Sequence, residues 1–280
     1  MSPLVFTVVV FASSLVAGVF GSLLGLGGGI IVVPVLTLAL GIDIRYAIGA
    51  SIVSVIATSS GAAAAYVREH LANLRVAMFL ELATTTGAIS GAFLAGLVDP
   101  RWLFIAFGLL LGYSAFAMLR RPHEDTQSVP ADSLADRLRL HGAYFDPVTG
   151  IEHSYRVGRV KLGLVLMYLA GAVSGLLGIG SGAFKVPAMD LAMGLPIKVS
   201  TATSNFMIGV TAASSAGVYF SRGDIDPFVA GPVAAGILLG AFAGSRLLNR
   251  LPANRLRMAF VVVLLAIAIE MLYHGVVGHG

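Results

Sequence analysis

The sequence predicts an all-α integral membrane protein built as an inverted repeat of two five-segment halves. Of the 280 residues, 57% are hydrophobic and only 11% are charged, and the mean hydropathy is +0.91. Soluble domains carry roughly 25% charged residues, so this chain lacks the polar side chains to cover a water-facing surface. Two further observations carry the prediction: a Gly-rich passage occurs twice, and the basic residues lie between apolar stretches.

The repeat is recognised by one constant offset along the chain. Gly25-Leu26-Gly27-Gly28-Gly29, followed by Pro34, corresponds to Gly178-Ile179-Gly180-Ser181-Gly182, followed by Pro187. The offset is 178 − 25 = 153 residues, and it also pairs Ser51 with Ser204 and Thr58 with Thr211. Glycine interruptions at matching places in two apolar repeats indicate the binding site of a transporter.

Each half is predicted to contain five apolar segments, of which the second is short. The segments are 4–24, 29–41, 44–67, 75–97 and 102–119, then 160–179, 183–194, 199–220, 227–248 and 254–273. A dozen helical residues cover ~18 Å of a hydrocarbon core of about 30 Å. We therefore expect 29–41 and 183–194 to be half-helices that begin at the glycine breaks. The predicted domains are a first transmembrane repeat (1–119), a polar cytoplasmic loop (120–159) and a second transmembrane repeat (160–280).

The polar segment 120–159 is the one part of the chain with a soluble composition. Its later part, Tyr144–Gly150, contains the turn-forming pairs Asp146-Pro147 and Thr149-Gly150. Two interpretations stay open: a small hairpin, or a loosely folded linker.

Orientation in the membrane follows from the basic residues, which collect on the cytoplasmic side. With segment 120–159 in the cytoplasm and the short segments counted as crossings, 14 basic residues lie inside and three outside. Five crossings per half give the two repeats opposite orientations, with both termini outside. This architecture is typical of secondary transporters.

The two glycine breaks are candidate parts of a site for an anion. A membrane helix can be broken only where protein or a water-lined cavity receives the freed backbone groups. Half-helices that begin at the breaks would direct free N–H groups and positive dipole ends toward one midplane cavity. Alternatively, the glycines only allow close helix packing. The candidate residues here are Gly25, Gly27, Gly28, Gly29, Gly178, Gly180, Ser181 and Gly182.

Hydroxyl-bearing residues follow each half-helix, and they are the second group of candidates. A small hydroxyl can donate a hydrogen bond to an oxyanion without adding charge, but Ser and Thr in membrane helices also commonly satisfy backbone carbonyls. The candidates are Ser51, Thr58, Ser204, Asn205 and Thr211.

Lys185 lies three residues after the second break, where the first repeat has Val32. A charge inside a membrane segment is costly and is by default a functional hypothesis. Lys185 could supply positive charge for an anion; the alternatives are that it reaches the interface or pairs with Asp190. Glu81 is a candidate proton carrier, although a pair with an interfacial arginine is the stronger expectation.

Several other classes of function are excluded. The chain has no cysteine, and its six histidines fall in loops or at segment ends, so the sequence offers no thiol chemistry and no convergent metal ligands. Ile30 and Ala183 stand where a dinucleotide-binding loop needs its last glycine. We therefore predict no enzyme, no metal, no cofactor and no nucleic-acid partner.

The duplicated Gly25-x-Gly27-Gly28-Gly29…Pro34 passage and the Ser/Thr-rich helices that follow it resemble the sulfite exporter TauE/SafE family. The resemblance covers nearly the whole chain except 120–159. It implies a secondary permease of the bacterial inner (plasma) membrane for a small sulfur-containing anion, such as sulfite or an organosulfonate.

The expected mechanism is alternating access around a midplane anion site, in contact with membrane lipid, with proton or other ion coupling left open. Ser181 and Lys185 depart from the family pattern, which has glycine and an apolar residue there. Two alternatives are an anion channel and a non-transporting sensor that signals through segment 120–159.

Overall fold

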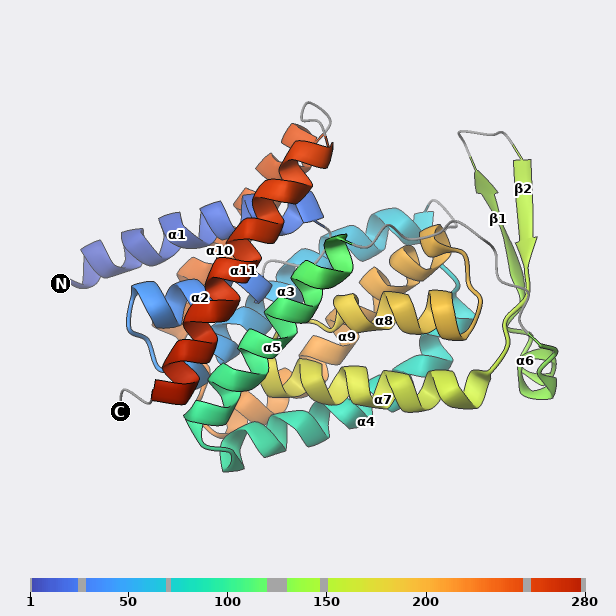
Figure 1. Ribbon diagram of the computed structural model, residues 1–280, viewed down its shortest axis with the longest axis horizontal. Coiled ribbons are helices and arrows are strands. Elements are labelled where there is room, and N and C mark those ends of the chain that lie inside the picture. Colours follow the sequence, from blue (N-terminus) through green and yellow to red (C-terminus); the bar gives the residue numbers. More distant parts are fainter. Residues whose placement is uncertain are drawn as a thin grey trace.

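The computed structural model of the protein describes residues 2–24, 29–68, 72–119, 130–146, 151–248 and 253–277. Over these ranges the chain is almost entirely helical (Figure 1). A helix of 18 residues is about 27 Å long, close to the thickness of a bilayer core, and longer helices exceed this length. The helices of that length are α1 (Pro3–Leu24), α3 (Ile44–Arg68), α4 (Leu74–Leu97), α5 (Pro100–Leu119), α7 (Val160–Leu177), α9 (Ile197–Ser221), α10 (Pro227–Leu248) and α11 (Ala253–Val277).

Two short helices lie where the sequence predicts them, one directly after each glycine break. α2 (Gly29–Pro34) continues into the wider π-helical turn η1 (Val35–Ala39), and α8 (Gly182–Pro187) continues into η2 (Ala188–Ala192). The widening follows a proline in both cases, because proline lacks the N–H of an α-helical hydrogen bond and its ring displaces the preceding turn. In Figure 1, α2 lies in the left half of the molecule and α8 in the right half.

The bounds of the elements repeat with the offset found in the sequence. α2, η1 and α3 begin and end 153 residues before α8, η2 and α9, since 182 − 29 = 197 − 44 = 153. The packing repeats as well: α1 lies on α10 as α7 lies on α4, while α3 packs on α9 and α5 on α11. The equivalent helices α5 and α11 run in opposite directions in Figure 1, where α5 rises from the lower left and α11 returns to it.

The helix pairs α4–α7 and α1–α10 approach closely at equivalent glycines. A β-carbon on Gly171 of α7 would collide with the backbone of Thr84 in α4. Its counterpart Gly18 of α1 meets the backbone of Ile237 in α10, and Ile237 is the counterpart of Thr84. Small residues at these crossings let the helix backbones come together, as in other membrane helix pairs.

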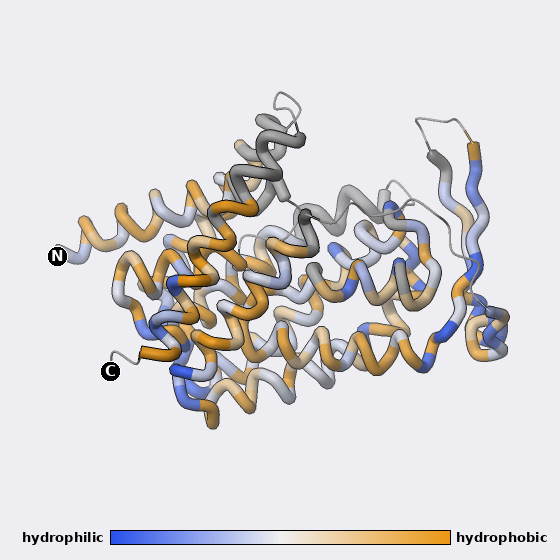
Figure 2. The backbone as a smooth tube through the Cα atoms, viewed as in Figure 1, coloured by the Kyte–Doolittle hydropathy of each residue, from blue (hydrophilic) through white to orange (hydrophobic). Residues whose placement is uncertain are grey.

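The outer surface of the helical body is apolar. Leu97, Phe228 and Phe220 are 84%, 80% and 73% exposed, and Figure 2 shows hydrophilic residues gathered on the strands, on α6 and at helix ends. By length and composition, α4 and α7 are suited to cross a membrane. A surface of this kind is stable when lipid covers it.

The segment between the halves forms a small cap at one end of the helical body (Figure 1). It contains α6 (Ser133–Arg137) and the antiparallel strands β1 (Gly142–Asp146) and β2 (Ile151–Tyr155), with Gly142 opposite Tyr155. Of the two interpretations of this segment, the small hairpin is confirmed and the loosely folded linker is not. The turn of the hairpin, residues 147–150, lies outside the described residues.

The cap is packed against the ends of α4 and η2. Leu140, Tyr155 and Val157 are buried in one apolar cluster with Val76 of α4 and Met193, which follows η2. The side-chain amide of Asn73 donates to the Leu140 carbonyl and to the Tyr155 hydroxyl, both at 2.9 Å. The segment is therefore joined to the transmembrane body by both apolar packing and hydrogen bonds.

Candidate substrate site

The first residue of α2, Gly29, lies against the second glycine break, beside α3. The hydroxyl of Ser51 in α3 donates to the Gly178 carbonyl at 2.7 Å. A β-carbon on Gly29 would lie 2.5 Å from that hydroxyl and 3.1 Å from that carbonyl oxygen. The start of α2 therefore touches the end of α7. Of the first break, Gly25, Gly27 and Gly28 lie outside the described residues.

The second break is a run of left-handed backbone between α7 and α8. Gly178, Gly180 and Ser181 have φ angles of 67°, 77° and 52°. Glycine adopts this region freely, whereas a serine there is uncommon and strained. Among the residues that the structure describes, the buried hydroxyl oxygens of Ser181 and Ser204 have no hydrogen-bond partner. A β-carbon on Gly182 would lie 3.8 Å from the Ser204 hydroxyl, so both hydroxyls lie at the start of α8.

Lys185 of α8 is the centre of a buried polar cluster. Its side chain is 0% exposed, and its Nζ donates to the Thr211 hydroxyl of α9 at 2.6 Å. That hydroxyl oxygen lies 2.6 Å from Oε1 of Glu81 in α4, to which it donates. Oε2 of Glu81 lies 3.9 Å from the lysine nitrogen. Three elements from both halves of the chain thus contribute one residue each.

These contacts decide between the alternatives for Lys185 and Glu81. A fully buried lysine does not reach the interface, and in the described part of the chain its ionic partner is Glu81 rather than Asp190. The expectation that Glu81 pairs with an interfacial arginine is wrong. The pairing arises because α4 and α8 both pack on α9, which brings together residues far apart in the sequence. The only sequence signal for it was that two opposite charges both fall inside membrane segments.

Of the remaining candidates, Thr58 and Ser51 bind backbone carbonyls. The Thr58 hydroxyl donates to the Ser54 and Val55 carbonyls of its own helix, at 3.0 and 3.2 Å. Ser51 is bound to Gly178, and Asn205 is half-buried. A role for these residues in substrate binding stays a prediction.

The polar cluster has no equivalent in the first repeat. At the 153-residue offset, Lys185 corresponds to Val32, Glu81 to Ala234 and Thr211 to Thr58. Val32 is 1% exposed and belongs to the apolar core. The charge is therefore confined to one side of an otherwise repeated structure.

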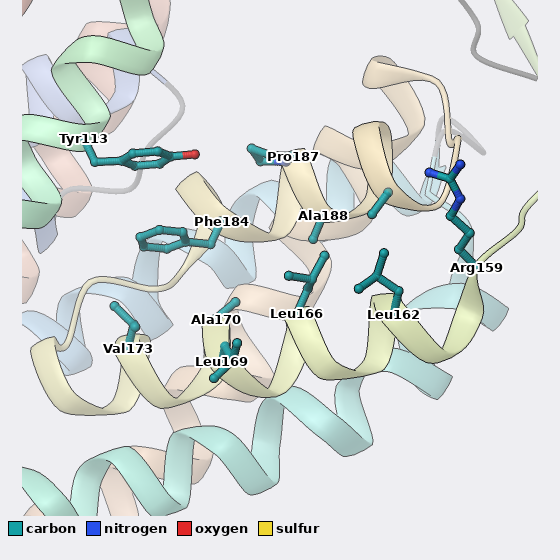
Figure 3. Close-up of a pocket in the computed structure, with 11 residues that line it drawn as sticks. Tyr113, Arg159, Leu162, Leu166, Leu169, Ala170, Val173, Phe184, Pro187 and Ala188 are labelled. Carbon is teal, nitrogen blue, oxygen red and sulfur yellow. The ribbon is translucent and has the colours of Figure 1, made fainter. Parts of the chain in front are cut away.

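An apolar cavity of about 600 Å³ lies beside α8, between α5 and α7 (Figure 3). The rings of Tyr113 and Phe184 stack at one end, with centroids 5.6 Å apart, and Arg159 lies at the other end. Neither Lys185 nor Glu81 lines this cavity, so the polar cluster is separate from it in this conformation. The lining residues are Tyr113, Arg159, Leu162, Leu166, Leu169, Ala170, Val173, Phe184, Pro187, Ala188 and Ala192.

Comparison with known proteins identifies the family of the chain. The model of the family described as "Sulfite exporter TauE/SafE" matches residues 10–271. The chain belongs to the TauE/SafE family. It is 25% identical to the probable membrane transporter protein YunE of Bacillus subtilis over 96% of this chain and 98% of the relative.

Further relatives of the chain are also named as membrane transporters. A probable membrane transporter protein of Xylella fastidiosa is 26% identical over 95% of both chains, and MJ0441 of Methanocaldococcus jannaschii is 23% identical over 92% of both. No solved structure matches the chain. The family and the named relatives all indicate a membrane transporter. The buried lysine therefore lies inside a transport protein.

Proposed function

We propose that the protein is a secondary permease for a small sulfur-containing anion, such as sulfite or an organosulfonate. The observation that carries the proposal is the 0% exposed Lys185 inside a transporter of the TauE/SafE family. An ammonium buried in a membrane protein is costly and is retained where it binds something. The substrate's oxygens would accept hydrogen bonds from this ammonium, beside the Thr211 hydroxyl, and from the hydroxyls of Ser181 and Ser204 at the start of α8.

The site fits the needs of a carrier. Charge-assisted hydrogen bonds to an oxyanion are strong, but a site with one cation and several neutral hydroxyls can also release its ligand. The unpartnered hydroxyls of Ser181 and Ser204 gain partners when an anion arrives, which favours binding because buried polar groups without partners cost free energy.

We propose further that alternating access uses the two halves as an inverted repeat. The shared offset of the element bounds and the exchanged packing partners support a pseudo-two-fold relation. The opposite directions of α5 and α11 support an axis in the membrane plane (Figure 1). In this arrangement the cap would lie in the cytoplasm and both termini outside the inner membrane.

Counterflow in liposomes tests the transport proposal. Purified protein is reconstituted with an unlabelled anion inside, and entry of the labelled anion is followed for sulfite, sulfate, thiosulfate, methanesulfonate and acetate. A carrier produces a transient accumulation of label that saturates with concentration, and we expect this for at least one sulfur anion but not for acetate.

The variant Lys185→Met should lose this accumulation, while Lys161→Met, which changes an exposed lysine, should retain it. Flux that is strictly downhill and does not saturate would contradict the carrier and favour the anion channel.

A further inference from the structure

The carboxylate of Glu81 has two oxygens in different environments. Oε1 accepts hydrogen bonds from the hydroxyls of Thr211, at 2.6 Å, and Thr85, at 3.2 Å. Oε2 is buried and has no hydrogen-bond partner among the described residues, although it lies 3.9 Å from the Lys185 nitrogen. A buried carboxylate oxygen without a donor is costly while it is charged. Oε2 is therefore the atom at which a proton is best accommodated.

The pairing also limits what Lys185 can do. While Glu81 is ionised, its charge compensates the ammonium, and an incoming anion meets a carboxylate at the same place. In a medium of low dielectric constant this repulsion is strong over a few ångströms. When Glu81 is neutral, the cluster carries one net positive charge, and the ammonium is available to an anion.

We propose that Glu81 is the proton-binding site of this transporter and that an anion binds Lys185 only after Glu81 has taken up a proton. The transporter then moves one proton with each anion. This inference rests on the anion permease function proposed above and adds the coupling ion to it.

The step balances in atoms and charge. A proton from water binds Oε2 of Glu81 and converts the carboxylate to a carboxylic acid; Lys185 keeps its own protons throughout. The anion then accepts hydrogen bonds from the lysine ammonium. For a monovalent sulfonate, proton and anion cross with no net charge, whereas a dianion carries one net negative charge. The reverse steps release both on the other side.

Water reaches Glu81 more readily than Lys185. The Glu81 side chain is 12% exposed and the Lys185 side chain 0%, although the Oε2 atom itself is buried. Thr211 connects the two groups because its hydroxyl oxygen accepts from the lysine and lies 2.6 Å from Oε1 of Glu81; the Met207 carbonyl, at 2.9 Å, is a second acceptor for its one hydrogen.

Other ionisable groups on the surrounding elements make contacts of their own or lie elsewhere. On α7, the Tyr168 hydroxyl donates to Ser90, and on α9, the Tyr219 hydroxyl donates to the Gly175 carbonyl. Arg75 of α4 donates to the Arg139 carbonyl in the cap. Within the described residues, Glu81 forms its ion pair with Lys185. The full set on α4, α7, η2 and α9 is Arg75, Lys161, Tyr168, Asp190, Lys198 and Tyr219.

Proton movement and counterflow, measured together, test the proposal. Methanesulfonate and sulfate are used because their charge is constant across the pH range. Wild-type liposomes containing a pH dye should acidify when the anion enters, and methanesulfonate uptake should not respond to membrane potential while sulfate uptake should. The apparent affinity of the wild type for both anions should fall as the pH rises, by at most about tenfold for each pH unit.

The variant Glu81→Gln should lose both the acidification and the pH dependence of whatever counterflow it retains, because glutamine is neutral at every pH. Glu152→Gln, at an exposed position of β2, is the matched control and should behave as the wild type. Acidification by Glu81→Gln, or a wild-type pH profile equal to that of Glu81→Gln, would overturn the proposal.

Infrared titration separates failure of this proposal from failure of the permease function. In protein without substrate, the C=O band of a protonated carboxylic acid should appear as the pH falls and should be missing from Glu81→Gln. If no anion gives counterflow, the permease function fails, and the band still reports whether Glu81 binds a proton. If counterflow occurs but the wild-type and Glu81→Gln spectra are identical at every pH, the proton site is wrong.

Discussion

At the scale of single residues, the main feature is a lysine and a glutamate that the fold brings together from α8 and α4. Taking two charges out of water is expensive, and their attraction compensates only while both are present. Removing one charge should therefore be much more destabilising than removing both. This difference allows the contribution of the pair to stability to be separated from its contribution to transport.

Lys185→Met should destabilise the protein strongly, because it leaves the Glu81 carboxylate buried without its cation. The loss expected for breaking such a pair is about 3–5 kcal/mol. The double variant Lys185→Met/Glu81→Gln should recover most of it, and Lys161→Met should change little. Thermal unfolding in detergent compares the four proteins. A double variant as unstable as the single one would show that the pair does not account for the effect.

The pairing of Glu81 with Lys185 could not be predicted from the sequence. The positions of the short helices around it could be. The duplicated glycines and prolines predict where α2 and α8 begin, because backbone that departs from a helix needs those residue types locally. Which residue faces Lys185 depends on how α4 and α8 pack on α9, and α4 is in turn held against α7 by the close approach at Gly87 and Gly171. These are tertiary contacts, which local propensity does not determine. The same reason explains why the expected arginine partner of Glu81 was wrong.

At the scale of elements, the break between α7 and α8 determines where the polar cluster lies. Gly178 has a φ angle of 67° and ends α7, and a β-carbon there would lie 2.7 Å from a methyl carbon of Ile48 and 2.9 Å from its backbone oxygen. The position requires glycine both for its conformation and for its lack of a side chain.

Gly178→Ala should therefore destabilise the protein by about 2 kcal/mol or more, the left-handed conformation alone costing roughly 1–2 kcal/mol. Gly217→Ala in α9 is the control, because a β-carbon there meets nothing within 4 Å. It should be neutral or stabilising by up to about 1 kcal/mol. Unfolding of both variants in the same detergent gives the comparison, and equal stability would argue against a strained break.

The cap contains its own pH-sensitive contact. The Asp132 carboxylate accepts hydrogen bonds from the backbone N–H groups of Val160, at 2.7 Å, and Leu134, at 2.9 Å. These bonds, that of Val160 first, hold the pKa of Asp132 below its ordinary value of 3.8. A lowered pKa means that the contribution to stability is complete above pH 3.8 and is lost as the pH falls toward the lower pKa of the folded state.

Acidification below about pH 4 should therefore loosen the attachment of the cap to the start of α7. Limited proteolysis of residues 130–159 with an acid-active protease should become faster in that range. Asp132→Asn should remove this pH dependence, because the amide does not titrate. A wild-type cleavage rate that stays constant with pH would show that the Asp132 contacts do not hold the cap.

At the scale of the whole molecule, we propose that two similar halves with opposite directions enclose one asymmetric substrate site. The family match over residues 10–271 establishes a membrane transporter of the TauE/SafE family. The repeat explains how such a protein could expose one site to either side, and the single charged cluster explains why the two halves need not contribute equally to binding.

Orientation in the membrane can be measured directly, because the chain contains no cysteine. Ser154→Cys reports on the cap, and Ser221→Cys reports on the end of α9; both positions are exposed. A membrane-impermeant maleimide should label Ser221→Cys in spheroplasts with an intact inner membrane, and Ser154→Cys only after permeabilisation. The reverse pattern would place the cap outside and contradict the orientation derived from the basic residues.

The most direct test of the account is the affinity of purified protein for sulfur anions, measured by titration calorimetry with the wild type and Lys185→Met/Glu81→Gln. The double variant removes the binding charge without leaving a bare carboxylate, so its fold should survive. We predict that the wild type binds at least one of sulfite, sulfate, thiosulfate and methanesulfonate, and that the double variant binds that anion at least tenfold more weakly. Equal affinity of the two proteins for every anion would remove Lys185 from the substrate site and contradict the account.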